Sequence, residues 1–374
     1  MEKTRLRERL IQLTRDLVLI ESTDAKPEER NRCFQLFRNH LEEVGGVTLQ
    51  MHEKEGYESL VALPEGISRP DVLFCGHLDV VEHPTSDHYR SEIRDGSIIG
   101  PGAGDMKGQL AILLELFRHL HREYPGISVG MAITSDEERG GENGVKFLVE
   151  EIGLRCGVAI IPDGGSLTEI TREEKGILHL RLLARGKAAH AARPWLGVNP
   201  LETLIASLSG IRAAFDEMIP EKFSADNPAS HWFPTCSITN ASTPNDSPNR
   251  IPEQAEAILD VRFPPPHTVE SMLKLLKELA GKNVKVETIV AAEATHLKTD
   301  QRFVEISGEV AGKQAKTVAA CGGSDARFFF AENIPVLLSR PYVGNLHGKD
   351  EWIEIDSMLD YFEICRRYVL EYVD

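Results

Sequence analysis

The sequence predicts an α/β protein with a mostly parallel central sheet, interrupted by a smaller α+β domain. Apolar strand-like runs alternate with helix-period segments in the first part of the chain, which is typical of β-α units around a parallel sheet. A middle segment changes to strands with two-residue alternation. Apolar strands resume at 317–323 and 335–341, so we expect the middle segment to be an insertion.

The first elements follow one another at regular spacing. Residues 6–20 carry leucine or isoleucine at spacings of three and four among charged residues, which predicts an amphipathic helix and neither a signal peptide nor a membrane span. Strand-like runs follow at 71–77, 127–135 and 157–164. A helix after the first run presents one apolar face, formed by Leu110, Leu113, Leu114 and Phe117.

The inserted segment has its own pattern. Residues 177–186 and 255–263 alternate as half-buried strands do, and further strands are expected near 231–239 and 284–290. A helix with Leu201, Leu204, Ile205, Leu208 and Ile211 in phase follows the first strand, and a second covers 268–281. The order β-α-β-β-α-β predicts a two-layer ferredoxin-like domain at 176–292, with 1–175 and 293–374 forming the main domain.

Composition limits the classes of function. The chain has 374 residues, 41% hydrophobic and 27% charged, and a formal net charge of −16. This charge argues against nucleic acid or an anionic membrane surface as a partner. Six scattered cysteines without a C-x-x-C pair favour reduced thiols and a cytoplasmic location.

Polar residues follow the ends of several predicted strands. His77 and Asp79 close the first run in "LFCGHLDVV", and Asp163 follows a later run. Asp105 lies in the glycine-rich "GPGAGDMKG" before a helix, Glu137 and Glu138 lie in "TSDEERGG", and "LHGKDE" adds His347. In open α/β sheets ligands gather at the carboxyl ends of strands, so these positions are candidates for one site.

Each of these residues also has an ordinary structural interpretation. Asp105 suits a helix cap, Asp163 a turn, the acidic pair Glu137 and Glu138 a solvated loop, and His347 the surface. Together, however, several carboxylates at one sheet edge repel one another unless a cation lies between them. Imidazole and carboxylate ligands without thiolate suit catalytic zinc, with cobalt or manganese possible, and five ligands suit two ions that share a carboxylate.

The motifs "GHLDVV", "GDMKG", "DEERGG", "HAARPWLGVNP" and "HGKDE", with Asp163, resemble family 20 of the metallopeptidases along nearly the whole chain. The resemblance implies a dizinc aminopeptidase-like catalytic domain with a lid that also forms a homodimer. Asp105 would bridge both ions, with Glu138 and His347 at one and His77 and Asp163 at the other. Asp79 would accept the second ring N–H of His77, and Glu137 would be the general base.

The resemblance also implies contacts from outside the ligand set. His190, in "GKAAHAARP", would stabilise the oxyanion, often across the dimer. Asn249 and Arg262 are similar to lid positions that contact substrate, although Arg262 also suits an ordinary cross-strand ion pair. The turn "CGGSDARFF", with Gly323 and Ser324, could hold a substrate carboxylate or simply start a helix.

The chain departs from the family pattern at positions that shape the pocket. Glu174 and Lys175 stand where desuccinylases carry two arginines, and Pro101 replaces an arginine. We therefore expect a zinc hydrolase that cleaves an amide bond of a small N-acyl amino acid or short peptide with a free carboxylate. The alternatives are a dipeptidase or aminopeptidase of the same family, a non-catalytic dimeric metal- or ligand-binding relative, and a dinuclear phosphoesterase.

Overall fold

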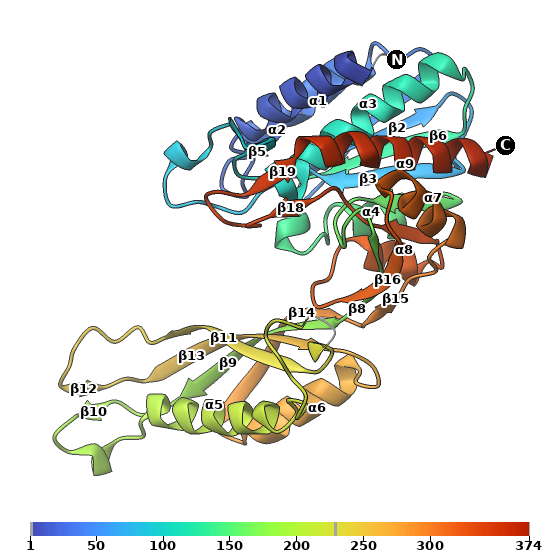
Figure 1. Cartoon of the computed structure of the whole chain (residues 1–374). Helices are drawn as coiled ribbons and strands as arrows, with labels where there is room; N and C mark the ends of the chain where they lie inside the picture. The colour runs from blue at the N-terminus through green and yellow to red at the C-terminus, as the bar shows by residue number, and fades with distance from the viewer. Residues whose placement is uncertain (1–2, 228–229, 374) are drawn as a thin grey trace. The chain divides into compact units, whose positions relative to one another are not determined.

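The computed structural model describes residues 3–227 and 230–373, which form two compact units (Figure 1). The first unit takes in the described residues of Met1–Arg172, Leu297–Val318 and Ser324–Asp374. The second takes in those of Glu173–His296 and Ala319–Gly323. The chain crosses between the units after Arg172 and after His296, whereas the sequence predicts crossings after residues 175 and 292. The short return segment 319–323 was not predicted.

The central sheet is mixed, with a parallel middle. Its strands run in the order β1-β2-β6-β3-β7-β17-β8-β15, and β16 pairs with β8. The middle strands β6, β3, β7 and β17 are parallel, as predicted, whereas the pairings toward both edges are antiparallel. The bounds are β1 Val47–Lys54, β2 Tyr57–Pro64, β3 Val72–His77, β6 Val129–Thr134, β7 Val158–Ile161, β8 Glu169–Glu174, β15 Thr295–His296, β16 Lys316–Ala320 and β17 Val336–Leu338.

Helices cover both faces of the parallel strands, which explains why these strands are apolar throughout. Every residue of β3 and β6 is buried. Successive side chains point to opposite faces, so Phe74 belongs to one core and Leu73 to the other. The first core involves α1 (Lys3–Val18), α2 (Pro27–Leu41), α3 (Gly108–Glu123), α7 (Gln301–Ala311) and α9 (Ile355–Val373); the second involves α4 (Val145–Glu150) and α8 (Ala326–Ala331).

A small antiparallel sheet lies beside the first helical layer and carries the loops of the site. Its order is β18-β19-β5-β4, with bounds β18 Val343–Gly344, β19 Trp352–Glu354, β5 Ser97–Ile99 and β4 Glu92–Arg94. The loop between β18 and β19 contains His347. The chain after β5 forms a short irregular helical turn, Ala103–Lys107, which leads into α3 and contains Asp105.

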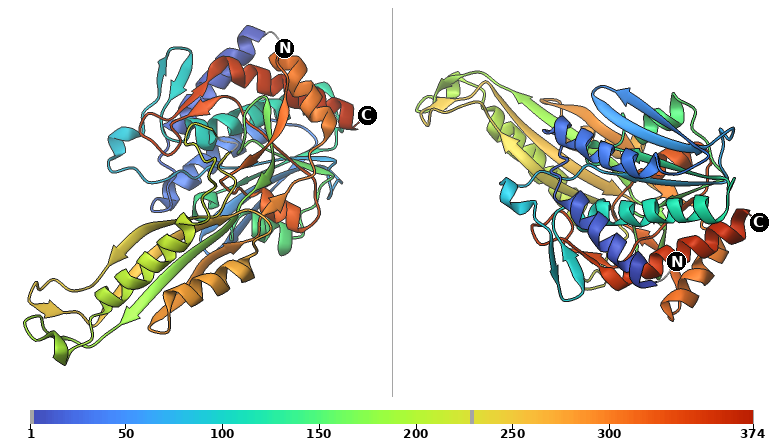
Figure 2. Two further views of the ribbon diagram at one scale, coloured as in Figure 1. Left: turned by 60° about the horizontal axis from the view of Figure 1, so that its bottom comes forward. Right: turned by 90° about the horizontal axis from the view of Figure 1, so that it is seen from above.

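The second unit has the β-α-β-β-α-β order that the sequence predicts. Its antiparallel sheet runs β11-β13-β9-β14, and both helices lie along one face (Figure 2). The bounds are β9 Gly176–Arg185, α5 Pro200–Asp216, β11 Thr235–Ser242, β13 Gln254–Phe263, α6 Val269–Ala280 and β14 Val284–Ala292. A separate pair joins β10 (Ala189–His190) to β12 (Arg250–Ile251).

The alternating pattern of β13 is confirmed in detail, whereas one position of α5 is not. In β13 every second residue is buried, from Ala255 to Phe263. In α5, Leu204 and Ile211 pack in the core, but Ile205 is 60% exposed. A helix that packs one narrow stripe on a sheet leaves the residue next to that stripe in solvent, and Ile205 takes that place.

All six cysteines are free thiols, as the scattered spacing predicts. Among residues 3–227 and 230–373, no helix combines the length and the apolar composition that a membrane crossing requires.

Candidate metal centre and active site

Parallel strands bring the predicted site residues to one edge of the sheet. His77 is the last residue of β3, and it is paired in register with Thr134, the last residue of β6. Glu137 and Glu138 follow β6, and Asp163 follows β7, the other neighbour of β3. All three strands point the same way, so their carboxyl ends lie side by side.

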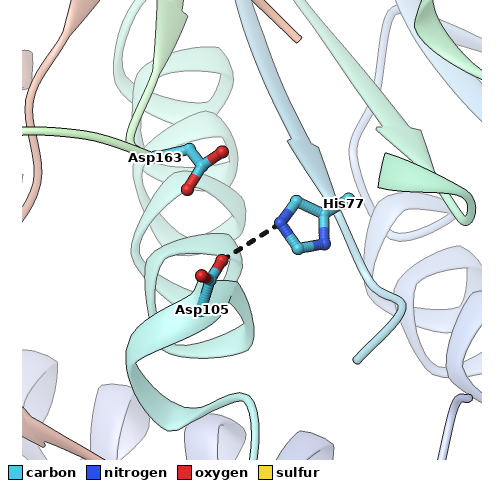
Figure 3. A group of neighbouring side chains, drawn as sticks. All are labelled: His77, Asp105 and Asp163. Atoms are coloured by element: carbon cyan, nitrogen blue, oxygen red, sulfur yellow. Dashed lines mark hydrogen bonds and ion pairs between the residues drawn. The ribbon is translucent and has the colours of Figure 1, made fainter. Parts of the chain in front are cut away.

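A first group of potential metal ligands consists of His77, Asp105 and Asp163. One ligand atom from each lies within 4.8 Å of the others (Figure 3). The ring Nε2 of His77 is 3.2 Å from Oδ1 of Asp105, and Figure 3 shows Asp163 facing the same space from the end of β7.

A second group consists of Asp105, Glu138 and His347. Nε2 of His347 lies 3.4 Å from Oδ2 of Asp105 and 3.3 Å from Oε1 of Glu138. Asp105 therefore belongs to both groups and uses a different oxygen in each. One carboxylate between two triads is the arrangement that suits two neighbouring divalent ions.

The charges of the site also fit a pair of cations. Burial, together with the nearby charge of Asp105, raises the pKa of Asp163. Although burial acts to raise it, contacts with His347 and His77 lower the pKa of Asp105. Oε1 of Glu138 is buried, and its described contact is the 3.3 Å ion pair with Nε2 of His347. Carboxylates with opposed pKa shifts and a buried oxygen that faces only an imidazole suit a site that binds positive ions.

Asp79 contacts Nδ1 of His77 through both its backbone carbonyl and its carboxylate. The shorter contact of Nδ1 is with the backbone carbonyl of Asp79, at 3.1 Å, and the carboxylate lies 3.4 Å away. A carbonyl can only accept, so Nδ1 carries a proton and Nε2 faces the ligand group. The Asp79 carboxylate accepts the backbone N–H groups of Glu137 and Glu138 at 3.3 and 3.0 Å, so it also holds the acidic loop.

Glu137 lies beside both groups without belonging to either. Its Oε2 is 4.0 Å from Nε2 of His77. Burial raises the pKa of Glu137 well above its ordinary value; the His77 charge opposes this shift and the Asp163 carboxylate adds to it. A carboxyl group that readily holds a proton next to the metal ligands suits general acid–base chemistry.

Close packing places the ligand-bearing segments. A Cβ atom on Gly76, which precedes His77, would meet Cε of Met106 at 2.5 Å, so a larger residue here would displace the side chain of Met106 in the turn that carries Asp105. Glu351 is 1% exposed, and its carboxylate accepts the backbone N–H groups of Gly104, Asp105 and His347.

Sequence reasoning missed Glu351, Arg340 and a buried pair of acids. Arg340 lies 3.7 Å from Asp163. Burial and the nearby charge of Asp325 raise the pKa of Asp136 to about 7. Burial raises the pKa of Asp325 to about 6, against the opposing charges of Arg327 and His77. The sequence carries only weak signals for these residues. Asp136 begins the acidic run that contains Glu137 and Glu138, and Glu351 and Arg340 lie near His347 in the chain.

His190 and Asn249 lie together in the second unit. His190 is exposed on β10, and the carbonyl of Asn249 accepts the N–H of Ala191 at 2.7 Å. Nδ1 of His190 accepts the N–H of Ala192 at 3.1 Å. A neutral ring bonded in this way carries its proton on Nε2, which is then free to donate to an oxyanion.

The remaining predicted contacts have partners within the chain. Arg262 donates to both carboxylate oxygens of Asp260, at 2.7 and 3.0 Å, in a pair along β13 and not across strands. Ser324 is buried, and its hydroxyl accepts the N–H of Ala326 at 3.3 Å, at the start of α8. Gly323 precedes it in the segment that groups with the second unit.

Comparison with known proteins is consistent with this site. Acetylornithine deacetylase of Proteus mirabilis is 28% identical over 92% of each chain, and succinyl-diaminopimelate desuccinylase of Bordetella parapertussis is 27% identical over 96% of each. An M20 family metallo-carboxypeptidase from Sulfolobus solfataricus has the same fold, with a TM-score of 0.79, 19% identity, and coverage of 100% of this chain and 99% of that one. Human carnosine dipeptidase 1 has a TM-score of 0.76 at 17% identity, covering 99% and 98%.

The model of one peptidase family matches residues 73–371, a span that begins in β3 before His77 and ends in α9 beyond His347. The match covers most of the chain. The chain belongs to peptidase family M20/M25/M40, whose members are hydrolases.

Proposed function

We propose that this protein is a dizinc hydrolase that cleaves the amide bond of a small N-acyl amino acid or short peptide with a free carboxylate. The observation that carries the proposal is the shared use of Asp105 by two triads, with Glu137 adjacent and outside both. Curated relatives named as a deacetylase and a desuccinylase favour removal of an acyl group.

The residues present can hold two ions. His77 and Asp163 would hold one, Glu138 and His347 the other, and Asp105 would bridge them. Zinc suits the mixed imidazole and carboxylate donors, and cobalt or manganese would also fit. When bound, the ions supply Lewis acidity and lower the pKa of water.

Glu137 performs the proton transfers of the proposed reaction. Its carboxylate takes a proton from the attacking water and then delivers it to the leaving nitrogen. The raised pKa of Glu137 suits this double role, because the group must hold the proton between the two steps. Asp79 keeps the loop of Glu137 in place through its two backbone hydrogen bonds, and His190, with Nε2 free to donate, would stabilise the oxyanion.

The proposal extends to the partner and the setting of the enzyme. We expect a homodimer formed through the lid, residues 176–292, in which His190 serves the site of the second copy. We also expect substrate contacts from Asn249, Arg262, Gly323 and Ser324, and a cytoplasmic location.

The test combines metal analysis with a panel of N-acyl amino acids and dipeptides. Glu137→Gln should lower kcat by about 10²- to 10⁴-fold while metal content stays at two ions per chain. Glu142→Gln is a matched control, because Glu142 is exposed on the same loop and pairs only with Lys146 among the contacts described. Full metal occupancy with no turnover, or an unchanged rate in Glu137→Gln, would refute the proposal.

The same panel separates the two readings of the substrate. A deacylase prefers substrates with a blocked amino terminus, whereas a dipeptidase or aminopeptidase requires the free α-amine. Human carnosine dipeptidase 1 shares the fold, so free dipeptides belong in the panel.

A further inference from the structure

Arg340 occupies the position next to the candidate metal centre along the sheet edge. β17 pairs in parallel with β7, and Leu338 is in register with Ile161. Two residues further along each strand, this register aligns Arg340 with Asp163. β3 pairs with the other side of β7, with Phe74 in register with Ile160, which aligns His77 with Asp163 in the same way.

The guanidinium group of Arg340 does not use all of its hydrogen-bond donors within the described structure. NH1 lies 3.7 Å from Oδ1 of Asp163, which is an ion-pair distance and too long for a good hydrogen bond. Nε is buried and has no hydrogen-bond partner in the described structure. The side chain as a whole is 16% exposed, so other atoms of Arg340 reach the surface while the buried Nε donor is left unpaired.

Arginines with a structural role in the same unit look different. Arg155 donates to the carbonyls of Val149 and Leu154 and to the carboxylate of Glu332. Arg30 donates to three backbone carbonyls. Arg340 makes no comparable set of hydrogen bonds among the described residues, although it is more buried than Arg155.

The charges around Arg340 indicate what it is suited to bind. Glu137 lies outside both triads, so it would keep its negative charge when ions are bound, and a substrate carboxylate that comes close to it meets repulsion. A fixed guanidinium beside this site offsets that repulsion and offers the planar donor pair that matches a carboxylate.

We infer that Arg340 binds the carboxylate of the substrate and thereby makes the site selective for anionic over neutral amides. This inference rests on the proposed function and names a specificity-determining residue for it. The alternative is that Arg340 only holds Asp163 in position.

Binding to a metal-loaded Glu137→Gln protein tests the inference without turnover. The probes are N-acetylglycine and N-acetylglycinamide, which differ only in the carboxylate, and calorimetry measures both affinities. We expect the acid to bind about 10- to 100-fold more tightly than the amide. Adding Arg340→Met should abolish this preference, and Arg340→Lys should keep part of it, because lysine retains the charge without the planar donor pair.

Several outcomes would overturn the inference. These are an acid that binds no better than the amide, a preference that survives Arg340→Met, and an equal loss of both affinities together with loss of metal. The last result would show that Arg340 only positions Asp163. Arg155→Met is the control for removing a partly buried arginine, and it should leave the preference intact.

The test is independent of the proposed reaction. A protein that binds the acid through Arg340 but hydrolyses no member of the substrate panel would refute the proposed function and support the inference. A protein that hydrolyses N-acyl amino acids with the same acid preference in Arg340→Met would do the reverse.

Discussion

Glu351 offers a sharp test of how the candidate metal centre is held together. Its Oε1 accepts the N–H groups of Gly104 and Asp105 at 2.7 and 2.8 Å, and its Oε2 accepts the N–H of His347 at 3.2 Å. One buried carboxylate therefore fixes two of the three segments that carry ligands of the second triad, those of Asp105 and His347. We expect Glu351→Gln to weaken metal binding by about 10- to 100-fold, because the amide nitrogen cannot accept from His347.

The stability of the metal-free protein should change with pH in a defined direction. Burial, and next the charge of Asp105, raise the pKa of Glu351 from 4.5 to about 7. The folded protein thus holds this proton more tightly than the unfolded chain does. The resulting stabilisation of the folded state is about 3 kcal/mol. It is fully present below about pH 4.5 and is lost as the pH rises through 7.

Replacement by glutamine should therefore have opposite effects at the two ends of this range. At pH 5 the variant lacks one hydrogen bond to the neutral carboxyl and should be less stable by about 1 kcal/mol. At pH 8 it avoids burying a charge, and it should be more stable than the wild type in the absence of metal.

Denaturant unfolding at pH 5 and pH 8 in the presence of a chelator measures whether the stability difference between variant and wild type changes sign. Competition with a chelator measures metal affinity. Glu354→Gln, on β19 nearby, is the control, and it should shift neither quantity. A difference between Glu351→Gln and wild type that does not depend on pH, or an unchanged metal affinity, would show that Glu351 does not act as described.

Three further predictions concern other parts of the chain. In Gly144→Ala the added Cβ would meet Oδ1 of Asp136 at 2.1 Å, so we expect a loss of about 1–3 kcal/mol in denaturant unfolding; an unchanged midpoint would contradict the packing. Chelation should lower the Tm and zinc should restore it, because ions at 1,000 times their Kd stabilise by about 4 kcal/mol; equal Tm values would argue against tight sites. In the second unit, hydrogen bonds from His179 and Arg262 outweigh burial and lower the pKa of Asp260, so this carboxylate stabilises the fold above about pH 4 and loses that effect in acid. Asp260→Asn should thus reduce stability at pH 7 and reduce it progressively less as the pH falls below about 4, and equal losses at pH 7 and at low pH would disprove the ion-pair account.

The sequence predicts those strands whose pattern of apolar and polar residues follows directly from which of their faces are covered. β13 alternates because one of its faces packs on helices, and β3 is apolar throughout because both of its faces are covered. The antiparallel strands β1 and β2 were not predicted. β1 is a half-exposed edge strand without an apolar run, and β2, although mostly buried, pairs with β1 and with β6, which lies far along the chain.

The residues of the candidate site likewise divide into those that the sequence predicts and those that it does not. Strand ends and glycine-rich turns predict that His77, Asp105, Glu138, Asp163 and His347 lie at one edge of the sheet, as they do. The choice of these five as ligands, apart from neighbours such as Asp79 and Glu137, came from the family resemblance. Their metal-binding roles stay a prediction.

Arg340 and Glu351 were not predictable in this way. An arginine or a glutamate near a loop is ordinary in sequence. Arg340 acquires its place through the register of β17 on β7, and Glu351 through three backbone contacts.

Four buried acids outside the two triads add negative charge to this edge of the sheet. Asp79, Asp136, Asp325 and Glu351 are all buried, and three of them accept backbone N–H groups of the site loops. Each hydrogen bond orders a loop, but together they concentrate negative charge where water cannot screen it. The raised pKa values of Asp136, Asp325 and Glu351 reflect that opposition. Cations bound by the two triads, as we propose, would offset this charge. For this reason, metal affinity, loop stability and the pH dependence of unfolding should change together when any one of these carboxylates is replaced.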